Sequence, residues 1–157
     1  MKIRLQAVVI AILTFSFAAF AQTAGADNIA AQANLVTEFD VNGLKVIYKR
    51  RPNSATVAGG LFIRGGARNI TEKNAGIERL MLATAVEAGK NVPRATVRRD
   101  LSSSGSAISS GVSNDYSAIS LATTKPDFNR IFDIFAEVSL NPAFADEDIK
   151  RNKDAIL

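Results

Sequence analysis

The sequence predicts an α+β fold in which helices pack on one face of a mainly antiparallel sheet. Segments with the two-residue alternation of strands occur in two groups, and each group is followed by segments with the apolar period of helices. The predicted order is three strands, two helices, two strands and two helices, which is typical of a sheet covered on one side. The last helix is still running at Leu157, so we expect a fragment of a longer architecture.

The first three strands are marked by turn residues. Residues 36–39 alternate, and Asn42-Gly43, a dipeptide typical of two-residue hairpins, separates them from a second strand at residues 44–48. A third strand is expected at about residues 57–64. The paired glycines in and after it lack the Gly-Lys-Ser/Thr sequence of a phosphate-binding loop, so they indicate close packing and a turn.

The pattern then changes to the helical period. Asn74 is expected to cap a helix over about residues 75–88, which places four apolar residues on one face: Ile77, Leu80, Met81 and Ala85. A shorter helix at about residues 94–102 leads through Gly105 into strands at about residues 107–110 and 116–123.

The second pair of helices follows Pro126. Apolar residues recur at i, i+3, i+4 and i+7 and predict a buried stripe, which we interpret as core rather than as a cofactor site: Phe128, Ile131, Phe132, Phe135 and Val138. Asn141-Pro142 is expected to end this helix, and Asp146 is expected to cap the last one.

The amino terminus carries the pattern of a secretory signal peptide. Lys2 and Arg4 precede an apolar run that ends in the small-residue pattern Ala19-Phe20-Ala21. The run is shorter than the roughly 20 residues that cross a bilayer, although an uncleaved anchor is the alternative. We therefore expect a signal peptide at 1–21, a flexible leader at 22–34 and one domain at 35–157. The expected localisation is periplasmic or secreted, with no stable membrane span after cleavage.

Composition narrows the possible chemistry. The chain contains no cysteine and no histidine, which excludes thiolate chemistry and removes the commonest general base and zinc ligand. The formal charge of +4 falls to about +2 without Lys2 and Arg4. The densest basic run, Lys49-Arg50-Arg51, lies beside a predicted turn and indicates a solvated loop, so no nucleic-acid partner is expected.

Several local sequences occur in an order and spacing that resembles the amino-terminal domain of the pitrilysin/insulinase metallopeptidases, the inverzincins. The matching pieces are Asn42-Gly43-Leu44-Lys45-Val46, the strand end at residues 63–68, Asn74-Ala75-Gly76-Ile77, Asn114-Asp115-Tyr116-Ser117 and Asn141-Pro142-Ala143-Phe144. The resemblance covers nearly all of residues 36–157. It implies the LuxS/mitochondrial-processing-peptidase-like metallohydrolase fold.

The resemblance also locates the family's catalytic motif, His-x-x-Glu-His, whose histidines bind zinc and whose glutamate activates the metal-bound water. In this chain the histidine positions are Arg79 and Ala83 and the glutamate position is Leu82. None of these side chains supplies a ligand or a base, so we expect no bound zinc, no other cofactor and no catalytic residue.

The other carboxylates near the motif give no substitute. Asn152 falls where active relatives carry an assisting glutamate, and the third zinc ligand would fall about two residues beyond Leu157 by the spacing of the family. Glu78 and Glu87 are interpreted as solvated helix positions.

Peptide binding does not require the metal. In active relatives the substrate adds as a strand to the edge strand that corresponds here to Ser106, Ala107 and Ile108, and main-chain hydrogen bonds supply the contact. The alternative is that another part of a larger molecule covers this edge.

Two functions follow from the resemblance. The first is a non-catalytic subunit that pairs with a zinc-bearing homologue and helps to enclose peptide substrates. The second is a structural or assembly scaffold unrelated to proteolysis, as in the peptidase-like core subunits of a respiratory complex.

Overall fold

The computed structural model describes residues 31–156. The predicted signal peptide and most of the predicted leader lie outside the described residues, and residues 31–33 are helical. The chain divides into two units after Asn53. Among the described residues, no helix is long and apolar enough to cross a membrane.

The first unit contains the predicted hairpin. Strand β1 (Val36–Val41) pairs antiparallel with β2 (Leu44–Lys49). Asn42 and Gly43 both have positive φ, 52° and 85°, as a type I′ turn requires. The backbone N–H of Gly43 donates to the Asp40 carboxylate at 2.7 Å, which holds the turn. The hairpin prediction is confirmed.

The second unit is a three-stranded sheet in the order β3-β5-β4. Strand β3 (Thr56–Arg64) and strand β4 (Ala107–Val112) each pair antiparallel with the central strand β5 (Tyr116–Thr124). The hairpin forms a separate two-stranded sheet, whereas the sequence predicted one sheet. In the described part of the chain, β1 and β2 pair only with each other.

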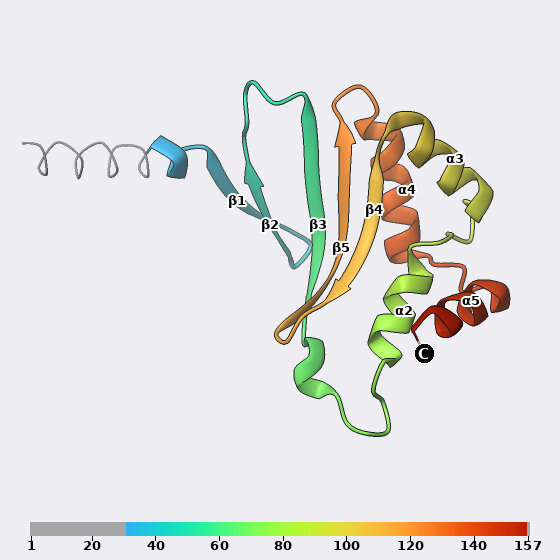
Figure 1. Ribbon diagram of the computed structural model, residues 1–157. Coiled ribbons are helices and arrows are strands. Elements are labelled where there is room, and N and C mark those ends of the chain that lie inside the picture. Colours follow the sequence, from blue (N-terminus) through green and yellow to red (C-terminus); the bar gives the residue numbers. More distant parts are fainter. Residues whose placement is uncertain (1–30, 157) are drawn as a thin grey trace, which may run out of the picture. The chain divides into compact units, whose positions relative to one another are not determined.

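Helices lie on one side of the three-stranded sheet (Figure 1). They are α2 (Ile77–Ala85), α3 (Arg94–Ser104), α4 (Phe128–Leu140) and α5 (Asp146–Ile156), and a short 3-10 helix, η1 (Gly66–Asn69), follows β3. Alternate residues of β5 are buried on the helix side: Ser117, Ile119, Leu121 and Thr123. The α+β class predicted from the sequence is confirmed.

The main core lies between the sheet and helices α3 and α4. Its buried residues are Val97, Leu121, Ile131, Ile134 and Val138. Phe128 and Phe135 pack against this cluster, but Phe132 is exposed and contacts the other two rings from outside. The predicted stripe was therefore wrong at Phe132, because Ile134 takes the inward position on α4.

The helix ends differ from the predictions in ways that matter at the site. Helix α2 begins after Gly76, whose φ of 83° favours glycine, and Asn74 does not cap it. The Asn74 side chain instead accepts hydrogen bonds from the backbone N–H and the hydroxyl of Thr71. Asp146 is the first residue of α5 rather than its cap. The pairing of Thr71 with Asn74 closes a turn before the helix, and this local alternative competed with capping.

Candidate functional site

Helix α2 carries the three positions that correspond to the family motif. Leu82 is among the most buried side chains of the described chain, at 2% exposure. Ala83 is half-buried and Arg79 is exposed. The motif positions therefore do not converge on a common polar site: one is packed inside, and one points into solvent.

The buried face of α2 explains this arrangement. Glu78, Leu82 and Ala85 follow one another at helical spacing, and Leu82 and Ala85 are buried. Below them, the hydroxyl of Ser117 on β5 donates a hydrogen bond to the Glu78 carboxylate. The predicted apolar face was wrong at Ile77 and Met81, which are exposed, whereas Ala85 is buried and Leu80 is half-buried. Helix α2 contacts both β4 and α5.

The side chains at the motif positions do not fit a zinc ion. A guanidinium has no lone pair to donate, and the Leu82 and Ala83 side chains contain only carbon and hydrogen. Among residues 31–156, no group of three or more acidic side chains is placed to hold a metal ion.

Asn152, at the assisting-glutamate position, lies on α5 beside α2. Its side-chain amide donates to the hydroxyl of the buried Thr84 at 3.3 Å. This contact joins the two helices next to the motif. Asn152 therefore holds α5 against α2, and as an amide it can neither accept nor release a proton as a carboxyl would.

A charged cluster lies just past the end of α2. We call it the ion-pair cluster: Glu87, Arg94, Arg98, Asp148 and Arg151. The Glu87 carboxylate accepts from Arg94 at 2.6 Å and from Arg98 at 3.3 Å, and Arg151 lies 3.9 Å away. The second carboxylate, Asp148, is buried and contacts Arg94 at 3.4 Å and also Arg151. The cluster links the end of α2 to α3 and α5.

The structure corrects the interpretation of Glu78 and Glu87 as solvated positions. Glu78 is half-buried and bonded to Ser117, and Glu87 keeps 17% of its side chain exposed. Burial raises the pKa of Glu87, but the hydrogen bonds and charges of Arg94 and Arg98 outweigh it, so this pKa lies below its ordinary value. The sequence alone could not reveal these contacts, because they depend on how α3 and α5 pack.

The predicted substrate-binding residues lie at the start of β4, which is an edge strand of the three-stranded sheet. The Ser106 hydroxyl bonds to the side chains of Ser104 and Thr123 at 2.7 and 2.8 Å. Ala107 is exposed on the open face, and Ile108 is half-buried toward the helices. The edge position matches the geometry that strand addition needs, and the binding role stays a prediction.

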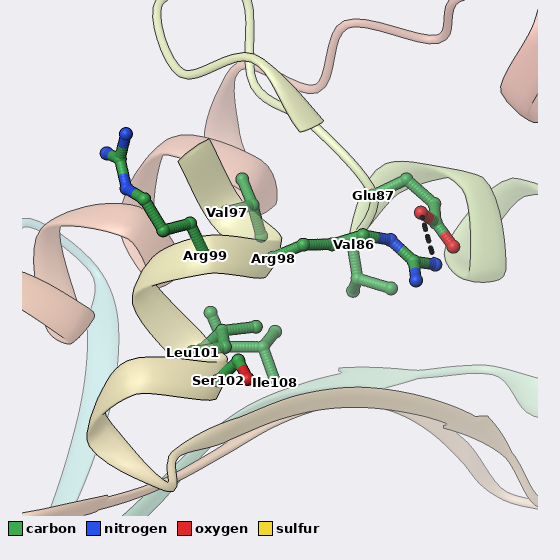
Figure 2. Close-up of a pocket in the computed structure, with 8 residues that line it drawn as sticks. All are labelled: Val86, Glu87, Val97, Arg98, Arg99, Leu101, Ser102 and Ile108. Carbon is green, nitrogen blue, oxygen red and sulfur yellow. Dashed lines mark hydrogen bonds and ion pairs between the residues drawn. The ribbon is translucent and has the colours of Figure 1, made fainter. Parts of the chain in front are cut away.

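A cleft of about 570 Å³ opens beside the start of β4. We call it the α3 cleft, and its lining residues come from the end of α2, from α3 and from β4: Val86, Glu87, Val97, Arg98, Arg99, Leu101, Ser102 and Ile108. Figure 2 shows the Arg98 side chain reaching from α3 to Glu87, while Arg99 points away from the other lining residues. Sequence reasoning missed this cleft. The apolar residues at the i, i+4 positions Val97 and Leu101 were the available signal.

Comparison with known proteins gives one family and one group of relatives. Residues 45–157 match the family model described as Insulinase (Peptidase family M16). The chain is similar to "Cytochrome b-c1 complex subunit 1, mitochondrial" from Mus musculus, with 26% identity over 116 residues. It is also similar to the proteins of that name from Bos taurus and Homo sapiens, with 25% and 24% identity.

These matches cover 74 to 78% of this chain but only 24 to 25% of each relative. The chain thus spans about a quarter of the length of the relatives that it matches.

The comparison contradicts the predicted periplasmic or secreted localisation. The relatives are named as mitochondrial proteins and not as exported ones. The prediction rested on Lys2 and Arg4, on the apolar run that follows them and on the small-residue pattern Ala19-Phe20-Ala21. This basic segment also contains no acidic residue before Asp27. Mitochondrial targeting segments are also basic and poor in acids, so this feature did not separate the two destinations.

Proposed function

Because this chain belongs to the insulinase family, peptidase family M16, we propose that it is a non-catalytic subunit of a protein assembly. In this role the peptidase fold binds a partner protein and performs no zinc chemistry. The proposal adds only a binding role to the family assignment, because the motif positions lack catalytic side chains.

The observation that carries the proposal is the burial of Leu82. The position that holds the catalytic base in active relatives is here a fully packed hydrocarbon, 2% exposed. Such a side chain contributes roughly 2 kcal/mol or more to folding by leaving water. The position therefore stabilises the domain, and restoring a carboxylate there would place a charge in the core.

The relatives support an assembly role. Each is named as a subunit of a cytochrome b-c1 complex. A subunit needs surface for its partners, and the described chain exposes several large apolar side chains, among them Phe62, Ile63 and Tyr116. Partner contacts would cover such surface.

The edge strand β4 supports a finer candidate of the same kind. In the second unit, β4 pairs with β5 alone, so its other side offers main-chain hydrogen-bonding groups. We propose that Ser106, Ala107 and Ile108 receive an extended segment of the partner by strand addition. A zinc-bearing homologue is one such partner, with which the chain would enclose peptide substrates.

Affinity purification of the full chain from its own cells tests both candidates. We expect stoichiometric co-purification with protein subunits, and no stoichiometric zinc in the purified chain by metal analysis. A partner carrying His-x-x-Glu-His supports the paired peptidase, and a complex without such a partner supports the scaffold. A monomeric chain that holds zinc and cleaves a quenched peptide by itself would overturn the proposal.

A further inference from the structure

Glu87 and Arg98 line the α3 cleft and also belong to the ion-pair cluster, so the cleft combines apolar and charged groups that a ligand must match. We propose that the α3 cleft receives an extended segment of a partner protein that carries an apolar side chain and, two residues away, an Asp or Glu. This inference rests on the proposed strand addition to β4, and it adds the side-chain chemistry that the partner segment must have.

The base of the cleft is apolar. Val97 is buried, and Leu101 and Ile108 are half-buried against the main core, so these three side chains form a fixed surface. Val86 at the end of α2 adds to this lining. The cleft volume of about 570 Å³ is large enough for one aliphatic or aromatic side chain together with part of its backbone.

The wall of the cleft has surplus positive charge. The ion-pair cluster contains three guanidiniums and two carboxylates, so one cation lacks a full counter-ion. Arg98 is the most exposed of the three, at 60%, against 32% for Arg94 and 42% for Arg151. Asp148 contacts Arg94 and Arg151, but no contact joins it to Arg98 among the ion pairs of the described chain. The surplus charge therefore resides at Arg98, on the cleft.

The geometry of a strand fixes the spacing of the ligand residues. Ile108 faces the helix side of the sheet, since its partner on β5 is the buried Leu121. In a segment added beside β4, every second side chain points to that same side. A residue opposite Ile108 would enter the cleft, and the residues two positions before and after it would face the helix layer that carries Arg98.

A labelled peptide tests the inference. Its sequence is symmetric, so it presents the same order of side chains whether it runs parallel or antiparallel to β4. The probe is Thr-Glu-Thr-Leu-Thr-Glu-Thr with an amino-terminal fluorophore, and binding to the full chain is followed by fluorescence anisotropy. The matched probes carry Lys in place of both Glu, Gln in place of both Glu, or Ser in place of Leu. We expect the acidic leucine peptide to bind most tightly and the lysine peptide most weakly.

Variants of one arginine inside the cleft and one outside it locate the contact. Arg98→Gln should weaken binding of the acidic peptide roughly fivefold, the size of a partly exposed ion pair, and should leave binding of the Gln peptide unchanged. Arg79→Gln, at an exposed arginine of α2 that does not line the cleft, is the control and should leave both unchanged. Arg98→Glu should reverse the preference toward the lysine peptide, and circular dichroism verifies that each variant is folded.

The outcomes separate this inference from the proposed function. Equal binding of the acidic, Gln and lysine peptides would overturn the charge selection and leave strand addition standing. Binding that depends on charge but survives the change of Leu to Ser would overturn the apolar seat. If no peptide binds, strand addition itself fails, and the inference fails with it.

Discussion

Leu82 on α2 and the ion-pair cluster just past the end of this helix lie a few residues apart, yet they hold opposite kinds of side chain. Leu82 is packed in hydrocarbon, whereas Glu87 is held by arginines from two other helices. Both sites connect α2 to its neighbours. Apolar packing therefore stabilises α2 at the position that corresponds to the catalytic glutamate of active relatives. The charged contacts just past its end join α2 to α3 and α5.

The largest effect is expected from a charge at the packed site. Leu82→Glu should lower the free energy of unfolding by roughly 4 kcal/mol or more, because a carboxylate would be buried without a partner. Leu82→Ala should cost about 3 kcal/mol through the cavity it leaves. Urea unfolding followed by circular dichroism measures both.

The exposed motif position is the control for this experiment. Arg79→Gln should change stability by less than about 0.5 kcal/mol, since it touches no buried feature. If Leu82→Glu lowered the free energy of unfolding as little as Arg79→Gln, Leu82 would not be a packed core position. The contrast between Leu82 and the ion-pair cluster would then fail.

The next largest effect belongs to the ion-pair cluster. Asp148→Asn removes a buried carboxylate between Arg94 and Arg151 and should cost about 2 kcal/mol. The value is below that of a fully buried pair because both arginines are partly exposed. Asp146→Asn, in the same first turn of α5 but exposed, should cost only a few tenths of a kcal/mol. If both changes lowered stability equally, Asp148 would act only as an acidic residue near the start of α5, and its ion pairs would add nothing.

A smaller effect is expected where α2 meets the sheet. Ser117→Ala removes the donor to the Glu78 carboxylate at a buried position and should cost about 1 kcal/mol. The matched change Ser109→Ala lies on the exposed side of β4 and should be close to neutral. Thermal unfolding of the two variants side by side measures the difference, and a neutral Ser117→Ala would mean that the hydrogen bond adds nothing to packing.

The smallest effect is a dependence of stability on pH, which is expected from Glu87 in the ion-pair cluster and not from Leu82. The pKa of Glu87 is lower in the folded chain than in the unfolded chain, so the unfolded state binds more protons as the pH falls. The stability from this group is complete above the ordinary carboxyl pKa, about 4.3, and is lost as the pH falls through the lower folded value. Urea midpoints measured between about pH 7 and pH 3 should fall less steeply for Glu87→Gln than for the unchanged chain. An unchanged slope would mean that Glu87 does not contribute to acid sensitivity.

Much of the fold followed from local pattern. The Asn42-Gly43 turn, the strands of the three-stranded sheet and the apolar period of α4 were each predicted within a few residues. These features depend on backbone preferences and on side-chain spacing, which are properties of short segments. The motif positions Arg79, Leu82 and Ala83 were located through the resemblance to the family, which rests on the order and spacing of local sequences.

The predictions failed where two elements compete for one face. The apolar residues Ile77 and Met81 indicated the inner side of α2, but α2 packs on the sheet and on α5 at once, and both residues remain exposed. Phe132 is exposed for a related reason, since Ile134 fills the core position on α4. Periodicity shows that a helix has an apolar stripe, but the neighbouring elements decide which stripe is covered.

The sequence by itself determined the class of fold and the family resemblance, and it predicted that the motif positions lack zinc ligands, because each depends on residue identity at a position along the chain. Only the tertiary structure decided that Leu82 is buried, that Glu87 lies beside three arginines of which two also contact Asp148, and that a cleft opens beside β4. Those contacts join residues from separate helices and strands. Their energies arise from burial and from distances between side chains, which exist only once the elements have packed.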